Sequence, residues 1–134
     1  MPNGCLSGPT QVIGDKDFVE PHPTDPNKMI AYVALQGPEA GTYFRGSGRL
    51  VNGFANIIPE DFRMVTDEKG ITVQVTPMGE PAMIWCVRKS LDKIELRGSS
   101  DVEFDFMVNG VGRMSKDRKA IVEKYCVRSP HSGR

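Results

Sequence analysis

A two-residue alternation of apolar and polar side chains constrains the fold of this chain more than any other feature. In residues 101–108 every second side chain is apolar and is expected to point inward: Val102, Phe104, Phe106 and Val108. Residues 71–76 alternate in the same way. A period of two places alternate side chains on one face of a β-strand, whereas a helix scatters them around its axis. Both segments are therefore predicted to be half-buried strands.

Turn signals divide the middle of the chain into further short strands. These strands are predicted at residues 29–36, 42–51, 54–58, 83–88 and 93–97. Asn52-Gly53 is the strongest hairpin signal, because a type I′ turn requires positive φ at both central positions, so residues 54–58 are expected to pair back on residues 49–51. Together these runs predict an all-β fold, an antiparallel β-sandwich or barrel-like module of about six to eight short strands.

Both ends of the chain depart from this pattern. Residues 1–14 are predicted to be a flexible arm, 15–113 the β module, and 114–134 a basic helix and tail. Three prolines within residues 21–26 forbid a helix and predict an extended, Pro-rich N-terminal arm. Apolar residues at helical spacing in residues 115–127 predict a short C-terminal amphipathic helix.

Charge and hydropathy narrow the range of partners. The chain has 17 Lys and Arg against 17 Asp and Glu, so nucleic-acid binding by the whole surface is not expected. The balance is uneven, because residues 1–112 carry a net charge of about −5 and residues 113–134 about +5. No apolar run approaches the ~20 residues of a membrane span, and the N-terminus lacks signal-peptide features, so we expect no membrane insertion and see no export route.

Residues able to carry catalysis or bind metal are sparse. Cys5, Cys86 and Cys126 lack zinc-ligand spacing, and neither His22 nor His131 has a neighbour able to orient it as a base. Cys86 lies in an apolar run and is predicted to be a small core residue. Cys5 is predicted to be an exposed free thiol or a link between subunits. We therefore expect no catalytic residue, no metal and no cofactor.

Two arginines on one face of a predicted strand are candidates for binding. Arg45 and Arg49 present rigid guanidinium forks suited to carboxylates, phosphates or acidic sugars, but pairing with Glu103 and Asp105 across the sheet or a subunit boundary is the favoured interpretation. Aromatic side chains elsewhere would add stacking contacts. The candidate ligand-binding residues are Tyr43, Arg45, Arg49 and Trp85.

Several short motifs, taken in order, resemble fibre-like proteins of bacteria and phages. They are DFVEPHPTDPNKMI (17–30), LQGPEAGTYFRG (35–46), LVNG (50–53), IPEDF (58–62), VQVTPMG (73–79) and VEFDFMVNGV (102–111). Over residues 15–113 the chain is similar to the C-terminal, fibre-tip-like β module of phage tail fibres and bacterial surface fibres. The resemblance implies a trimeric, non-catalytic structural or attachment protein at a cell surface or on a virion.

Apolar residues on both faces of residues 29–36 and 83–87 agree with that expectation, because one small module cannot cover them all. The predicted function is therefore a non-enzymatic β module that assembles as a homotrimer or filament, and the alternative is a carbohydrate- or receptor-binding tip. The candidate interface residues are Phe18, Val19, Pro21, His22, Tyr32, Ile121 and Tyr125.

Overall fold

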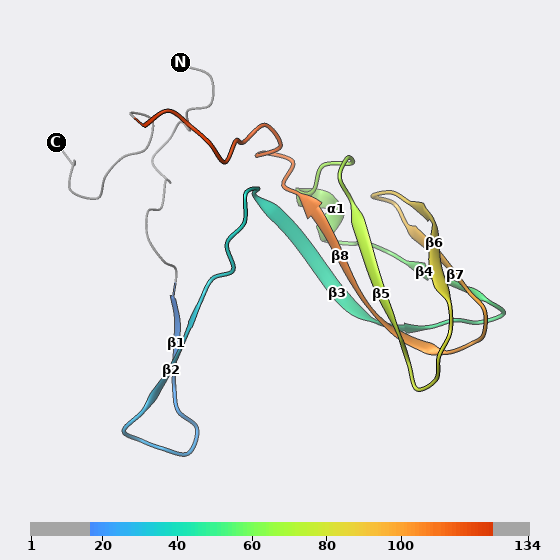
Figure 1. Ribbon diagram of the computed structural model, residues 1–134, viewed down its shortest axis with the longest axis horizontal. Helices are drawn as coiled ribbons and strands as arrows, with labels where there is room; N and C mark the ends of the chain where they lie inside the picture. Colours follow the sequence, from blue (N-terminus) through green and yellow to red (C-terminus); the bar gives the residue numbers. More distant parts are fainter. Residues whose placement is uncertain (1–16, 125–134) are drawn as a thin grey trace. The chain divides into compact units, whose positions relative to one another are not determined.

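The computed structural model describes residues 17–124, which fall into two compact units (Figure 1). One unit comprises the described chain up to Pro38 together with residues 118–124, and the other is Glu39–Asp117. Their regular structure is eight β-strands in antiparallel sheets and one short helix, α1 (Phe62–Val65). The prediction of an all-β, antiparallel fold is confirmed.

The first unit contains a β-hairpin. Strand β1 (Asp17–Pro21) pairs antiparallel with β2 (Met29–Val33), and Phe18 lies opposite Tyr32. The predicted extended arm is therefore corrected: the proline-rich stretch supplies one strand and the loop of a hairpin. Pro21 sits at the last position of β1, where a two-stranded sheet tolerates the missing N–H.

Side-chain and backbone hydrogen bonds close the hairpin loop. The Nδ1 atom of His22 accepts the N–H groups of Thr24 at 3.2 Å and Asp25 at 3.0 Å. The N–H of His22 donates to the carbonyl of Lys28 at 3.1 Å, and the carboxylate of Asp25 accepts the N–H of Asn27 at 3.0 Å. His22 thus has a structural role in the loop.

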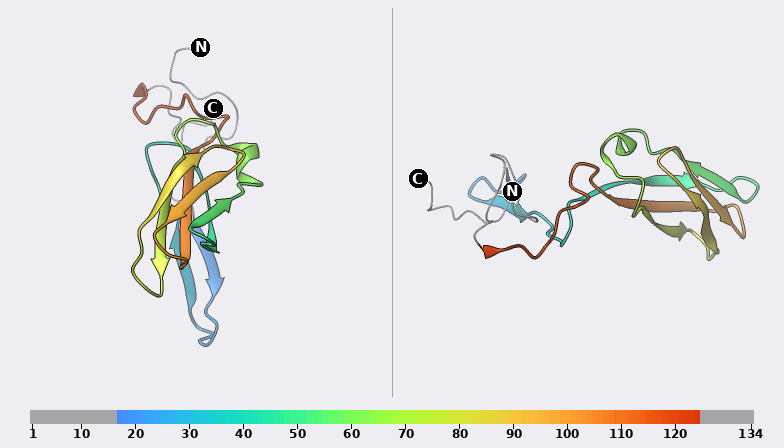
Figure 2. Two further views of the ribbon diagram at one scale, coloured as in Figure 1. Left: turned by 90° about the vertical axis from the view of Figure 1, so that its right-hand side faces the viewer. Right: turned by 90° about the horizontal axis from the view of Figure 1, so that it is seen from above.

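Two three-stranded antiparallel sheets make up the second unit (Figure 2). In the first sheet, β8 (Glu103–Val111) lies between β3 (Gly41–Arg49) and β5 (Thr72–Met78). In the second, β7 (Ile94–Gly98) lies between β4 (Phe54–Ile57) and β6 (Ile84–Lys89).

One cluster of buried side chains joins elements of both sheets. Phe104 on β8 is only 2% exposed, and Val102 and Val108 are buried as the alternation predicts, while Phe106 is partly buried. The buried hydrophobic residues are Leu50, Ile57, Phe62, Ile71, Ile94, Leu96, Val102, Phe104 and Val108. Burial of this apolar surface is the main stabilising contribution to the unit.

The Asn52-Gly53 turn forms as predicted, but the strand after it pairs elsewhere. Both residues have positive φ, 53° and 78°, and Val51 and Phe54 exchange backbone hydrogen bonds. Beyond this single bridge, β4 pairs with β7, with Phe54 opposite Arg97. The expected pairing on residues 49–51 is wrong, because the turn carries the chain from one sheet to the other.

Two further predictions differ from the structure. Cys86 is exposed, because it lies on the edge strand β6 beside a bulge between Cys86 and Arg88. The C-terminal helix is not confirmed: residues 115–123 form turns and bends. The last residues of that expected helix lie outside the described residues.

Candidate functional site

The outer face of β3 carries three of the four predicted ligand-binding residues. Tyr43, Arg45 and Arg49 are exposed on this face. Arg49 pairs with Glu103 at 3.6 Å, as predicted, and its guanidinium also donates to the carbonyl of Asp101 at 3.3 Å. An exposed pair of this kind contributes little to stability.

The acidic partners expected for Arg45 and Arg49 are only partly engaged. The carboxylate of Asp105 accepts a hydrogen bond from the hydroxyl of Ser47 at 2.7 Å rather than binding an arginine. Trp85, the fourth predicted residue, lies on β6 in the other sheet and is 47% exposed. The structure therefore does not gather the four residues into one site.

Trp85 instead belongs to a row of exposed side chains that crosses the β4–β7–β6 sheet. Arg97 on β7 lies opposite Phe54 on one side and opposite Trp85 on the other. The Arg97 guanidinium carbon lies 4.6 Å from the centre of the Phe54 ring, which is a cation–π geometry. We call these residues the Phe54–Arg97–Trp85 row. Sequence reasoning missed it because only the strand register brings the three together.

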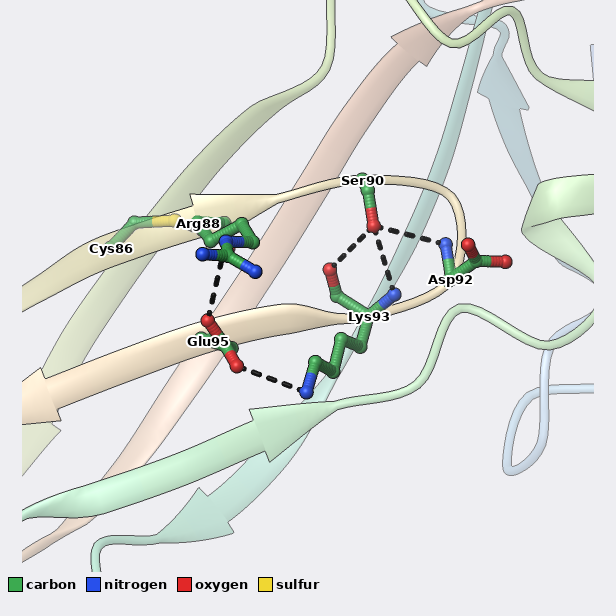
Figure 3. Close-up of polar contacts among 6 residues, drawn as sticks. All are labelled: Cys86, Arg88, Ser90, Asp92, Lys93 and Glu95. Carbon is green, nitrogen blue, oxygen red and sulfur yellow. Dashed lines mark hydrogen bonds and ion pairs between the residues drawn. The ribbon is translucent and has the colours of Figure 1, made fainter.

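Next to this row, a carboxylate is surrounded by basic residues (Figure 3). Glu95 accepts from Lys93 at 3.0 Å and lies 3.7 Å from Arg88. The hydrogen bond from Lys93, with the charges of Lys93, Arg88 and Arg97, lowers the pKa of Glu95. Three cations around one carboxylate leave the outer face of this sheet with a positive excess.

The same region contains the exposed thiol of Cys86. Burial raises the pKa of Cys86, although the nearby Lys89 opposes the shift. The Cys86 thiol donates to the carbonyl of Arg88 at 3.4 Å. Because the thiolate is the reactive form of cysteine, a raised pKa lowers the reactive fraction at a given pH.

An open cleft of about 580 Å³ lies between β3 and β4. Phe104 and Phe106 form part of its lining, together with Phe44, whose ring centre is 5.7 Å from that of Phe106. Gly46 and Gly48 leave room for these rings, since a Cβ atom on Gly48 would lie 2.7 Å from the Phe104 ring. The cleft therefore has three phenylalanine rings in a lining of mixed polar and apolar residues, beside an edge strand.

The predicted interface residues that the structure describes are exposed, except His22. Phe18 is 56% and Tyr32 68% exposed, Val19, Pro21 and Ile121 are exposed, and His22 is half-buried. Tyr125 and Cys5 lie outside the described residues. Exposure agrees with an interface role but does not test it.

Within residues 17–124, no three of the His, Cys, Asp and Glu side chains lie close enough together to hold a metal ion. None of the helices in that part of the chain has the length and apolar character needed to cross a membrane. Comparison with protein families, with curated proteins and with solved structures gives no match to this chain.

Proposed function

We propose that this chain is a non-enzymatic structural protein, a β module that assembles as a homotrimer or filament in a phage tail fibre or bacterial surface appendage. In this proposal the two sheets of Glu39–Asp117 act as the halves of a sandwich-like body. The order of the short motifs supports a fibre protein, and the exposed apolar side chains of the β1–β2 hairpin support assembly.

The observation that carries the proposal is that the hairpin is apolar on both faces. Phe18, Ile30 and Tyr32 share one face, while Val19 and Met29 lie on the other. All of these except Ile30 are exposed in the single chain. A two-stranded hairpin is marginally stable alone in water, so apolar side chains on both of its faces favour burial against another copy.

Two matched methionines test this proposal. Met29 on β2 is 60% exposed and Met64 on α1 is 61% exposed, so a lysine replaces equal apolar surface at each site. Sedimentation equilibrium of the full chain should give a mass above the monomer, which Met29→Lys lowers and Met64→Lys leaves unchanged. A wild-type chain that remains monomeric at millimolar concentration contradicts the proposal.

A second candidate function, binding of an acidic carbohydrate, is favoured by the Phe54–Arg97–Trp85 row. Aromatic rings stack on the apolar faces of sugar rings, and guanidinium groups bind carboxylates. Arg88 lies beside the row and adds positive charge. A surface of this kind suits an oligosaccharide that contains uronic or sialic acids.

The single tryptophan of the chain provides the readout for this candidate. Titration with oligogalacturonate should change Trp85 fluorescence and protect it from acrylamide quenching, and Arg97→Ala should abolish both effects. Arg63→Ala, on the exposed side of α1, is the control. Unchanged fluorescence with charged and neutral glycans alike would remove this candidate.

A further inference from the structure

Among the described strands, none pairs with the outer edge of β3 in the β3–β8–β5 sheet. The carbonyl of Ala40 accepts the N–H of Gly112 at 2.9 Å, and the N–H of Leu50 donates to the carbonyl of Val102 at 3.1 Å. Because backbone groups alternate direction along an antiparallel strand, even-numbered residues of β3 face β8. The N–H and C=O groups of Tyr43, Arg45 and Ser47 therefore face the outside of the sheet.

The other three edge strands carry features that limit pairing. By the same alternation, the even-numbered residues of β5 face β8 and the backbone of Pro77 faces the outside of the sheet. A proline has no N–H, so it cannot donate a hydrogen bond to an added strand there. Strand β6 has a bulge between Cys86 and Arg88, and β4 is only four residues long. Strand β3 has nine residues with neither a proline nor a bulge. It is the unprotected edge of the unit.

The aromatic cleft opens beside this same edge. A strand added to β3 would place every second side chain on the inner face of the sheet, over Phe44, Phe104 and Phe106 in the cleft. Its remaining side chains would lie on the outer face beside Tyr43 and Arg45. The edge therefore suits a strand with apolar side chains over the rings of the cleft and with acidic groups able to lie near Arg45.

The β1–β2 hairpin has the properties that this edge requires. Each of its faces carries apolar side chains, and within residues 17–124 each of its strands pairs only with the other. Residues 17–33 contain three carboxylate side chains against one lysine, whereas the outer face of β3 presents Arg45 and Arg49. The outward backbone groups of β3, the apolar side chains of the hairpin and the opposite charges of the hairpin and Arg45 thus agree with this pairing.

We propose that the free edge of β3 receives the β1–β2 hairpin of a second copy of this chain, by β-strand addition over the cleft. This inference rests on the proposed self-assembly and names the surfaces that form its interface. Exchange of an identical element between copies is a common route to oligomers. The apolar side chains of each hairpin would then be buried against the β3 edge and the cleft of the second copy.

Arg45→Pro tests the receiving edge in the full chain. The substitution removes an outward N–H and leaves the hydrogen bonds to β8 in place, because Arg45 does not face β8. Arg45→Ala removes the same side chain and keeps the N–H, so it is the matched control. We expect Arg45→Pro to weaken association at least about tenfold, the loss of one or more edge hydrogen bonds, and Arg45→Ala to change it much less.

Mixing two variants tests the hairpin and the β3 edge separately. It also shows whether the proline variant is folded, because a misfolded variant would not bind its partner. Met29→Lys alters the hairpin and keeps the β3 edge, while Arg45→Pro does the reverse. At a concentration too low for either variant to associate appreciably alone, an equimolar mixture should form a 1:1 pair. Amide exchange in the wild type gives a second readout: the N–H groups of Tyr43, Arg45 and Ser47 should slow as concentration rises, while those of Phe44 and Gly46 stay constant.

The outcomes separate this inference from the proposed function. If the wild type assembles and Arg45→Pro assembles equally well, strand addition at β3 is overturned while self-assembly stands. A monomeric wild type overturns both. Slow exchange of the outward amides in a chain that stays monomeric would mean that each hairpin pairs with the β3 strand of its own chain. That result would overturn the proposal that the hairpin comes from a second copy.

Discussion

The β1–β2 hairpin and the Glu39–Asp117 unit both contain strands with large apolar side chains, and they differ in what those side chains contact. In the larger unit, Phe104 is 2% exposed within a core that both sheets share. In the hairpin, Phe18 is 56% exposed although it lies opposite another aromatic residue, Tyr32. Apolar sequence therefore makes a core only where a second layer is present. The exposure of the apolar hairpin side chains within the described residues is the physical basis for proposing assembly.

Truncation of one phenylalanine in each region should separate the two roles. Phe104→Ala should lower the free energy of unfolding by about 3–5 kcal/mol, because it opens a cavity in the core. Phe18→Ala should leave the unfolding of dilute monomer almost unchanged and weaken association. Urea denaturation and sedimentation of both variants check this. Equal losses of unfolding free energy would show that the hairpin is already packed within one chain.

The Asn52-Gly53 turn offers a smaller effect confined to the larger unit. Asn52 has φ of 53°, a left-handed conformation that β-branched residues adopt with strain. Asn52→Val should cost about 1–2 kcal/mol of unfolding free energy. Asn52→Gly, which accepts this φ, is the control. Association at matched folded concentration should be the same for all three proteins, and a change in it would place the turn at the interface.

Local patterns in the sequence predicted local structure, and the long-range arrangement escaped them. The alternation at residues 101–108 and the Asn52-Gly53 turn depend on neighbouring residues, and both are confirmed. The strand that pairs with β4 lies far along the chain, so the turn alone led to the wrong prediction of its partner. Cys86 was misread because an apolar run does not show that its strand lies at an edge. The Phe54–Arg97–Trp85 row follows only from register.

A substitution in the hairpin loop provides the opposite test, because it should weaken association and leave the stability of the larger unit unchanged. His22→Ala removes the acceptor for the N–H groups of Thr24 and Asp25. The loss should weaken association by about 1 kcal/mol, a typical net contribution of one hydrogen bond in a partly exposed setting. His22→Asn, which retains an acceptor, should lose less. Unaltered association with a lowered urea midpoint would contradict the assignment of this loop to the assembling region.

The smallest expected effect is a pH dependence of the unfolding free energy that arises from Asp101. Hydrogen bonds from the N–H groups of Gly53 and then Asn52 lower the pKa of Asp101 below its ordinary value of 3.8. A depressed folded-state pKa contributes stability that is present above the ordinary value and lost as pH falls through the folded one. Asp101→Asn should therefore lower the urea midpoint at neutral pH, and the difference from wild type should shrink below pH 3.8.

A matched carboxylate controls for net charge in this pH experiment. Asp92 is exposed on the β6–β7 turn, and its N–H donates to Ser90. Asp92→Asn removes the same charge without touching the Asn52-Gly53 turn, so it should not reproduce the pH-dependent difference. If it does, general electrostatics rather than the hydrogen-bonded carboxylate explains the effect.

Amide hydrogen exchange of the wild-type chain at two concentrations tests most directly whether the hairpin depends on a second copy. The amides of β8 should exchange slowly at both concentrations, because they belong to the central strand of a sheet with its own core. Those of β1 and β2 should exchange rapidly in dilute solution and slow by at least about tenfold in concentrated solution. Hairpin amides that are equally protected at both concentrations, in a chain that sediments as a monomer, would contradict the account.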